Sequence, residues 1–235
     1  MTIFDSKVLN NFKISIEKGS FISIIGPIGC GKTFLLDEIS KNIDNKFILS
    51  CVNDKKKFNS SIKEELYNTL YSYGVTNKET KSRIKRVLKQ FNIYDYIYTD
   101  VKTLSDIDFK RFLLANALVT NPDVLIIDNL FAEFSRSETE EILKYLKKQC
   151  AKGMTVLFST YKLDYCLFSD YVLVMNNYNI LFFDKTMEVF KNEKIINSIG
   201  LRLPFMVDLS LKLRSYGLVN KIVTDMDRMV YYIWK

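Results

Sequence analysis

The sequence has 235 residues, the length of one large domain or of one domain with a small appendage. Hydrophobic residues make up 48% and charged residues 26%, a globular balance that excludes disordered and collagen-like chains. The net charge is +7 and histidine is absent, which excludes a histidine base, a phosphorelay or a histidine metal site. Because the basic residues are spread along the chain, we interpret the charge as solvated surface, with nucleic acid or an anionic membrane as open alternatives.

No apolar run approaches the roughly 18 residues of a membrane span, and residues 1–10 do not read as a signal peptide. We therefore expect a cytoplasmic protein, or one attached peripherally to the cytoplasmic face of a membrane. Four cysteines without paired spacing predict neither a disulfide framework nor a zinc site; they are Cys30, Cys51, Cys150 and Cys166.

In chain order, the apolar patterns predict strands that alternate with helices. The expected strands lie at 12–17, 21–25, 46–51, 124–127, 154–159, 171–175 and 180–183, and the last two pair with each other. The expected helices lie at 32–41, 61–71, 78–91, 105–118, 137–150, 204–214 and 224–232. A capping box of Ser137 and Glu140 is expected to open the fifth helix. This order predicts a three-layer α/β domain with a mostly parallel sheet and a helical block inserted in its middle.

A glycine-rich stretch follows the expected strand at 21–25 and precedes the expected helix at 32–41. It matches G-x-x-x-x-G-K-[ST] in full, through Gly26, Pro27, Ile28, Gly29, Cys30, Gly31, Lys32 and Thr33. In such a loop the backbone N–H groups point inward around a phosphate, and the lysine reaches the outer phosphates. Lys32 is thus the expected phosphate ligand, and Thr33 is expected to offer its hydroxyl to Mg²⁺.

A carboxylate at the end of another strand extends this prediction. Asp128 follows the apolar run at 124–127, which is typical of a buried parallel strand. Taken alone, Asp128 could equally be a helix cap or a loop residue. With a phosphate loop upstream, we interpret Asp128 as the second residue on the magnesium side of the site.

The segment before that strand resembles the signature of ABC-type ATPases. That signature reads L-S-G-G-Q and leads into a helix with a basic residue and an A-x-A-L ending. The matching positions here are Leu104, Ser105, Arg111, Ala115, Ala117 and Leu118, and residues 121–128 are similar to the family's P-x-h-h-h-h-D. The resemblance covers nearly the whole chain. It implies a P-loop NTPase three-layer sandwich that uses ATP and Mg²⁺.

The same resemblance implies partners. In ABC-type ATPases two subunits face each other, and each ATP lies between the phosphate loop of one and the signature of the other. A second ATPase subunit, identical or different, is therefore expected here. A transmembrane subunit would contact the helical block, through the stretch 54–91. We expect no nucleic acid partner, because the basic residues form no concentrated stripe.

A second resemblance concerns the end of the chain. Residues 200–214 look like the tail segment of energy-coupling-factor ATPases, the ATP subunits of vitamin and metal-ion importers. In those proteins a leucine- and proline-containing stretch lies at the ATPase dimer interface. This implies one ATP-binding domain over residues 1–235, with a helical subdomain at about 60–119 and a dimerisation tail at about 195–235. A generic amphipathic closing helix is the alternative.

Several positions depart from the ABC pattern. Asn129 stands where the family has a glutamate that activates water, and an amide cannot accept the proton. Tyr161 stands at the position of the family's switch histidine. Cys51 or Asn53 stands near the position where the family has a glutamine after its third strand. The signature glycines and glutamine become Asp106, Ile107 and Asp108, whose carboxylates are expected to repel a phosphate. A helix cap formed by Ser105 and Asp108 is compatible with this change.

At the start of the chain, Phe4 lies where the family stacks an aromatic ring on adenine, although most of the family's first strand is expected to be missing. The leading hypothesis is a degenerate ATP-binding subunit of an energy-coupling-factor importer, slow or inactive in hydrolysis at its own site. A second hypothesis relocates the water-positioning role to Glu133. A third is an ATP-binding module that serves no transporter.

Overall fold

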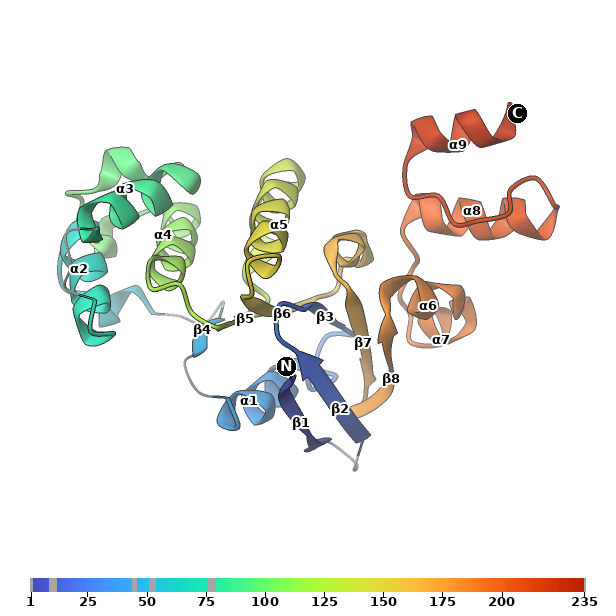
Figure 1. The fold of residues 1–235 in the computed structure, drawn as a ribbon, viewed down its shortest axis with the longest axis horizontal. Helices are drawn as coiled ribbons and strands as arrows, with labels where there is room; N and C mark the ends of the chain where they lie inside the picture. Colours follow the sequence, from blue (N-terminus) through green and yellow to red (C-terminus); the bar gives the residue numbers. More distant parts are fainter. Residues whose placement is uncertain (1, 9–11, 44–45, 51–53, 76–78, 235) are drawn as a thin grey trace.

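The computed structural model describes residues 2–8, 12–43, 46–50, 54–75 and 79–234. Its strands form a six-stranded sheet and a separate two-stranded ribbon (Figure 1). The strands are β1 (Thr2–Val8), β2 (Phe12–Glu17), β3 (Phe21–Ile25), β4 (Lys46–Ser50), β5 (Val124–Asp128), β6 (Thr155–Thr160), β7 (Tyr171–Asn176) and β8 (Asn179–Lys185).

The six-stranded sheet has the order β4-β5-β6-β3-β7-β8. Every neighbouring pair is parallel except β7 with β8, which form an antiparallel hairpin. The residues of β3, β5 and β6 are buried throughout, as expected for parallel strands covered on both faces. Because β5, β6 and β3 are parallel neighbours, the loops that leave their carboxyl ends meet at one edge of the sheet.

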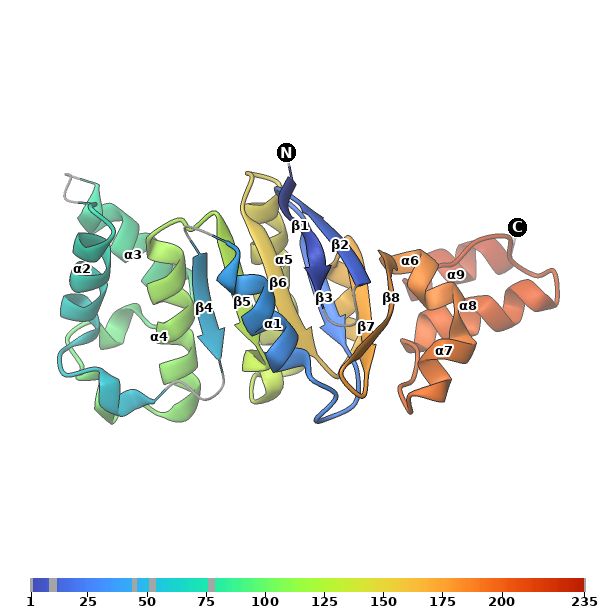
Figure 2. The same cartoon turned by 90° about the horizontal axis from the view of Figure 1, so that it is seen from below.

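Helices cover both faces of this sheet and extend beyond its two sides (Figures 1 and 2). Helix α1 and the β1–β2 ribbon lie on one face, and α5 lies on the other. The helices are α1 (Lys32–Lys41), α2 (Ile62–Ser72), α3 (Thr80–Gln90), α4 (Asp106–Val119), α5 (Arg136–Cys150), α6 (Thr186–Lys191), α7 (Glu193–Ser198), α8 (Phe205–Ser215) and α9 (Met226–Ile233). The expected three-layer α/β sandwich is confirmed.

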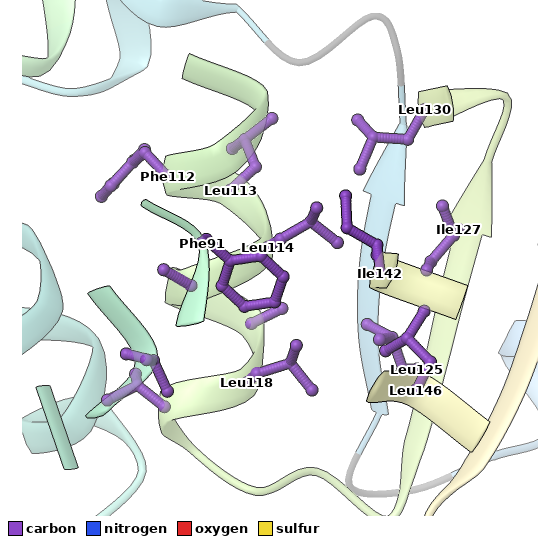
Figure 3. Packing of buried hydrophobic residues seen from close by; sticks show 14 of the residues in the cluster. Phe91, Phe112, Leu113, Leu114, Leu118, Leu125, Ile127, Leu130, Ile142 and Leu146 are labelled. Carbon is purple, nitrogen blue, oxygen red and sulfur yellow. The ribbon is translucent and has the colours of Figure 1, made fainter. Parts of the chain in front are cut away.

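Helices α2, α3 and α4 form the inserted block beside β4 (Figure 2). Their apolar stripes turn inward, with Leu66, Leu88 and Phe112 fully buried. One continuous core joins the block to the sheet, because α4 contributes Leu114 and Leu118 to the same cluster as Leu125 of β5 (Figure 3). This packing fixes the start of α4 relative to the sheet edge where β5 ends.

Helices α6 to α9 form the tail beyond β8, on the side opposite the helical block (Figure 2). Val207 of α8 is fully buried in a cluster with residues of β7 and α6. Helices α8 and α9 pack on each other through a small separate cluster around Val219, Val223 and Met229. None of the helices in the described residues is long and apolar enough to cross a membrane.

The observed elements differ from the expected ones in three places. The fifth helix is capped by Ser135, which accepts from the backbone N–H of Glu138, and not by Ser137 with Glu140. Both spacings fit a capping box, so the pattern alone could not choose between them. Before β2 the structure has a seven-residue strand, β1, which the apolar patterns did not predict and which pairs antiparallel with β2. The short helices α6 and α7 were not expected, because six residues carry too little periodicity.

Candidate functional site

The phosphate-loop motif forms the connection between β3 and α1. Gly26 lies close to β7, where a Cβ would come within 2.4 Å of the Met175 carbonyl oxygen. Gly31 has φ of 98° and precedes α1, and a Cβ there would lie 2.7 Å from the ring of Tyr178. Both positions need glycine, one for close approach and one also for its left-handed backbone. The motif therefore folds as the strand–loop–helix unit that its sequence predicts.

Lys32 turns back over its own loop. Its ammonium group donates to the carbonyl oxygens of Gly26 and Pro27 at 2.8 Å each, and it lies 3.7 Å from Cys30 Sγ. These contacts hold a positive charge at the mouth of the loop, at the amino end of α1. A phosphate bound there would meet a lysine, loop N–H groups and the positive end of the helix dipole together.

Thr33 and Asp128 are 95 residues apart in sequence and meet in space. The Thr33 hydroxyl donates to Asp128 Oδ2 at 2.7 Å, and the Ser159 hydroxyl donates to Oδ1 at 2.5 Å. Asp128 is only 7% exposed, and its hydrogen bond with Ser159 holds the carboxylate in one orientation. Hydroxyl and carboxylate oxygens are the ligands that Mg²⁺ prefers, and it usually takes only one or two from the protein beside substrate phosphates. The residues present fit a magnesium ion.

The next residue, Asn129, has a left-handed backbone with φ of 50°. Its N–H donates to the Ser159 hydroxyl at 2.9 Å, so one serine orders both the last residue of β5 and the residue that follows it. Tyr161 follows β6 and is 42% exposed. Asn129 and Tyr161 border the same pocket, to which they contribute an amide and a phenol.

This pocket lies over the phosphate loop and has a volume of about 620 Å³, a size typical of ligand sites. It brings together most of the residues singled out in the motif and at the ends of β5 and β6. It also includes three residues that the sequence analysis did not select, namely Phe34, Asp37 and Tyr178. Phe34 and Asp37 follow the motif on α1. Tyr178 comes from the turn between β7 and β8, which no sequence motif connects to the loop.

The β7–β8 turn has an unusual conformation. Asn177 and Tyr178 both have positive φ, of 46° and 59°. Hairpin turns of this kind favour glycine at the second position, and a bulky residue there costs about 1–2 kcal/mol. The Tyr178 N–H donates to the Cys30 carbonyl at 2.9 Å, and its ring packs on Gly31. These contacts join the turn to the phosphate loop.

The altered signature starts helix α4, and none of Leu104, Ser105, Asp106, Ile107 and Asp108 borders the pocket. The Ser105 hydroxyl accepts from the Asp108 N–H at 3.1 Å and donates to Asp108 Oδ2 at 2.6 Å, so the expected helix cap is present. This serine has both hydrogen-bonding directions occupied within its own chain.

Both signature carboxylates have cationic partners within the chain. The ammonium group of Lys55 lies 2.5 Å from the Asp106 carboxylate, and its hydrogen bond to that carboxylate lowers the pKa of Asp106. Lys55 also donates to the Leu104 carbonyl. Asp108 accepts from Arg111, which also binds Glu138 of α5. Burial lowers the pKa of Arg111, but its bonds to Glu138 and Asp108 outweigh this and raise it overall. The expected repulsion of a phosphate is therefore weakened by internal neutralisation.

Glu133 lies outside the pocket lining. It forms an ion pair of 2.5 Å with Lys110 of α4, whose side chain is 8% exposed. Asn129 borders the pocket and Glu133 does not. Phe4 pairs with Ile16 in the β1–β2 ribbon, but its side chain lies outside the described part of the structure. Cys51 and Asn53 also lie outside the described residues.

Comparison with known proteins identifies the class to which this fold and site belong. Residues 9–132, more than half of the chain, match the family described as ABC transporter. The chain is 29% identical to the energy-coupling factor transporter ATP-binding protein EcfA2 of Clostridium perfringens, over 92% of this chain and 86% of that protein. It is 25% identical to EcfA1 of Lactobacillus acidophilus, which carries the same description, over 97% and 91%.

Among solved structures, cbiO1 from Clostridium perfringens, described as part of the ABC transporter complex cbiONQ, superposes with a TM-score of 0.65. Its sequence identity is 22%, and the match covers 86% of this chain and 95% of that one, so it shows the shared fold. The chain belongs to the ABC transporter family as an ATP-binding subunit. Within that family it resembles the energy-coupling-factor ATP-binding proteins.

Proposed function

We propose that this chain binds Mg-ATP through the loop 26–33 and Asp128 and hydrolyses it slowly or not at all. The observation that carries the binding half is the meeting of Thr33 with Asp128 beside Lys32, three groups suited to Mg²⁺ and phosphate. When bound, Mg²⁺ would neutralise charge on the phosphates. Lys32 would bind the outer phosphates, while Ser159 holds the Asp128 carboxylate in place.

The proposal that hydrolysis is slow or absent rests on Asn129 and Tyr161. Both border the pocket, yet neither supplies the carboxylate or imidazole that serves as a general base: Asn129 has an amide, which accepts no proton, and Tyr161 has a phenol. Loss of a general base typically lowers a rate by about 10²–10⁴-fold. The amide of Asn129 can still hold a water molecule by hydrogen bonding, which is compatible with a closed ATP-bound state.

The transport role is that of the ATP subunit of an energy-coupling-factor importer for a vitamin or an ion. It is supported by the similarity to EcfA1 and EcfA2 and by the tail, which continues past β8 as in the implied family pattern. Phe205, Tyr231 and Trp234 of the tail are 65%, 54% and 85% exposed. Such apolar exposure supports a role of residues 195–235 in contact with a second ATPase subunit.

In this assembly the helical block would contact a transmembrane subunit, and the protein would lie peripherally on the cytoplasmic face of the membrane. The signature serine caps its own helix, and two carboxylates stand where the signature has a glycine and the glutamine. A partner with an intact signature therefore suits this chain better than a second copy. The chain would then hold ATP at one half-site and help to close the dimer, while the partner's site performs most turnover.

The test of slow hydrolysis is Asn129→Glu, with phosphate release measured on the purified chain together with its partner subunits. If only the base is missing, hydrolysis should rise by about 10²–10⁴-fold, the contribution typical of a general base. Asn121→Glu is a matched control, since Asn121 has the same left-handed backbone but lies outside the pocket. An unchanged rate would show that Tyr161 or the altered signature also limits hydrolysis.

The transporter role is tested by affinity purification of the tagged chain from native membranes. Recovery with a transmembrane subunit and a second ATPase that has L-S-G-G-Q and a catalytic glutamate would support the importer. Recovery from the soluble fraction without either subunit would contradict it and favour the alternative, an ATP-binding scaffold or regulatory module outside transport.

A further inference from the structure

A second cavity lies at the edge of the sheet opposite the phosphate loop. It has a volume of about 470 Å³, within the range of small-molecule sites. Its walls come from α3, α4 and α5 and from the segments that precede β3, β5 and β6. The phosphate loop and Asp128 lie at the carboxyl ends of these parallel strands, so the two cavities occupy opposite edges of the sheet. None of the described residues that line this cavity borders the phosphate-loop pocket.

The inner wall of this cavity is apolar. Leu118 and Met154 line it and are only 4% and 9% exposed. The ring of Tyr145 packs edge-to-face on Phe91, with ring centroids 5.8 Å apart, which fixes its position. Burial raises the pKa of Tyr145 against a smaller opposing effect of the Arg86 charge, so its hydroxyl stays protonated and can donate a hydrogen bond. A flat or aliphatic ligand body fits against this wall.

Two cations lie at the rim of the cavity. Arg86 of α3 and Lys152, which follows α5, both line it and have exposed side chains. Within the part of the chain that the structure describes, neither has an ion-pair partner. Lys18 also lines the cavity but pairs with Asp123 at 3.2 Å. Three cations and one carboxylate give the lining a net charge of +2.

These two cations are not needed to cap the helices that end beside them. Cations often lie at helix carboxyl ends, where carbonyl oxygens lack partners. Here the Lys89 carbonyl of α3 accepts from the Asn92 N–H at 3.2 Å. The Gln149 carbonyl of α5 accepts from the Lys152 N–H at 2.9 Å. Because the backbone supplies these hydrogen bonds, the side chains of Arg86 and Lys152 are available to a ligand.

Helix α3 adds to the positive field around the cavity. Its eleven residues include no acidic side chain and five basic ones, namely Lys81, Arg83, Lys85, Arg86 and Lys89. Charges of one sign around a cleft with apolar walls raise the local concentration of oppositely charged ligands. The cavity is therefore suited to an anion.

We propose that this cavity binds a small organic anion. The apolar or aromatic body of the ligand lies against Leu118, Met154 and Tyr145, and its carboxylate or phosphate group binds Arg86 and Lys152. A guanidinium group offers paired N–H donors that suit either anionic group. Such a ligand connects the helical block to α5, and its binding does not depend on ATP at the phosphate loop.

The test measures binding of 2-naphthoate to the purified chain by calorimetry. 2-Naphthamide has the same rings without the charge, and acetate has the charge without the rings. We expect 2-naphthoate to bind at least about tenfold more tightly than either, the effect of one hydrogen bond to a charged group. Comparison with 2-naphthyl phosphate then shows whether the rim prefers a carboxylate or a phosphate ester.

Arg86→Gln and Lys152→Gln should each weaken 2-naphthoate binding by about tenfold and leave 2-naphthamide binding unchanged. Lys85→Gln is the matched control, because Lys85 is an exposed cation of the same helix that lies outside the cavity lining. It changes the net charge equally but removes no contact, so 2-naphthoate binding should stay as in the wild type. All three side chains are exposed, and the melting temperature of each variant should match that of the wild type.

Three results would overturn the proposal. The first is that 2-naphthoate does not bind, or binds no better than 2-naphthamide. The second is that Arg86→Gln and Lys152→Gln bind it as the wild type does, or that Lys85→Gln weakens it equally. The third is competition by saturating Mg-ATP, which would place the anion at the phosphate loop. A chain that binds 2-naphthoate as expected but does not bind Mg-ATP refutes the proposed ATP site and leaves this cavity as an anion site.

Discussion

Replacing Glu133 by Gln separates a catalytic from a structural role of the carboxylate that lies four residues past Asn129. The structure gives Glu133 a partner, Lys110, at 2.5 Å. Removing one member of a fully buried ion pair costs about 3–5 kcal/mol, whereas an exposed pair is worth about 0–1 kcal/mol. Lys110 is 8% exposed but Glu133 is 56% exposed, so solvent screens much of the interaction. We expect Glu133→Gln to lower the free energy of unfolding by about 1–2 kcal/mol.

The measurement is urea unfolding followed by circular dichroism, with thermal unfolding as a second readout. For a chain of this size, each kcal/mol lowers the melting temperature by about 2–4 °C, so a shift of roughly 2–8 °C is expected. The double variant Lys110→Met with Glu133→Gln should recover most of the loss, because it removes both charges and keeps the apolar packing. Glu140→Gln, which breaks a pair with the 74% exposed Arg136, is the matched control and should change stability little.

The result that would refute this reasoning is a change in chemistry without a change in stability. If Glu133→Gln lowered ATP hydrolysis by the roughly 10²–10⁴-fold typical of a lost general base, and the melting temperature stayed at the wild-type value, Glu133 would be the relocated base. The ion pair with Lys110 would then be irrelevant to stability. Reduced stability with unchanged hydrolysis assigns Glu133 to the contact between α4 and the segment after β5.

Three further predictions concern other sites. Lys32→Ala should abolish ATP binding, measured by calorimetry, and retained micromolar affinity would contradict the phosphate-loop assignment. Cys150 and Cys166 should resist iodoacetamide at pH 7.5 in the native protein, as seen by mass spectrometry, because burial raises the pKa of each thiol to about 12. Rapid native labelling of either would show that its surroundings open readily. Ser105→Ala should lower the free energy of unfolding by about 1 kcal/mol through loss of the α4 cap, and an unchanged value would show that the cap contributes nothing.

The parallel sheet and its phosphate loop could be predicted because each local signal agreed with the next. Continuous apolar runs predicted β3 and β5, and the glycine-rich motif needed the strand before it and the helix after it. The meeting of Thr33 and Asp128 then followed from parallel strands ending at one edge. In this part of the chain, the local sequence motifs and the order of the strands predict the same site.

Other parts of the site could not be predicted because their partners are distant in sequence and carry no motif. Ser159, the second-to-last residue of β6, has an ordinary hydroxyl, and only the pairing of β6 with β5 brings it to Asp128. Tyr178 depends on the β7–β8 hairpin lying beside the phosphate loop. The pairing of these two strands was predicted, but no motif indicates that their turn lies against the phosphate loop.

The altered signature shows how a lost contact can leave a well-formed structure. Two carboxylates at the amino end of α4 suit the helix dipole, and Asp108 also joins the cap made by Ser105. Lys55 neutralises Asp106 from a neighbouring segment, whereas Arg111 of α4 itself neutralises Asp108 and extends the network to Glu138 of α5. Each of these polar and charged groups has a partner inside the chain, so α4 needs no phosphate from a facing subunit to complete its first turn.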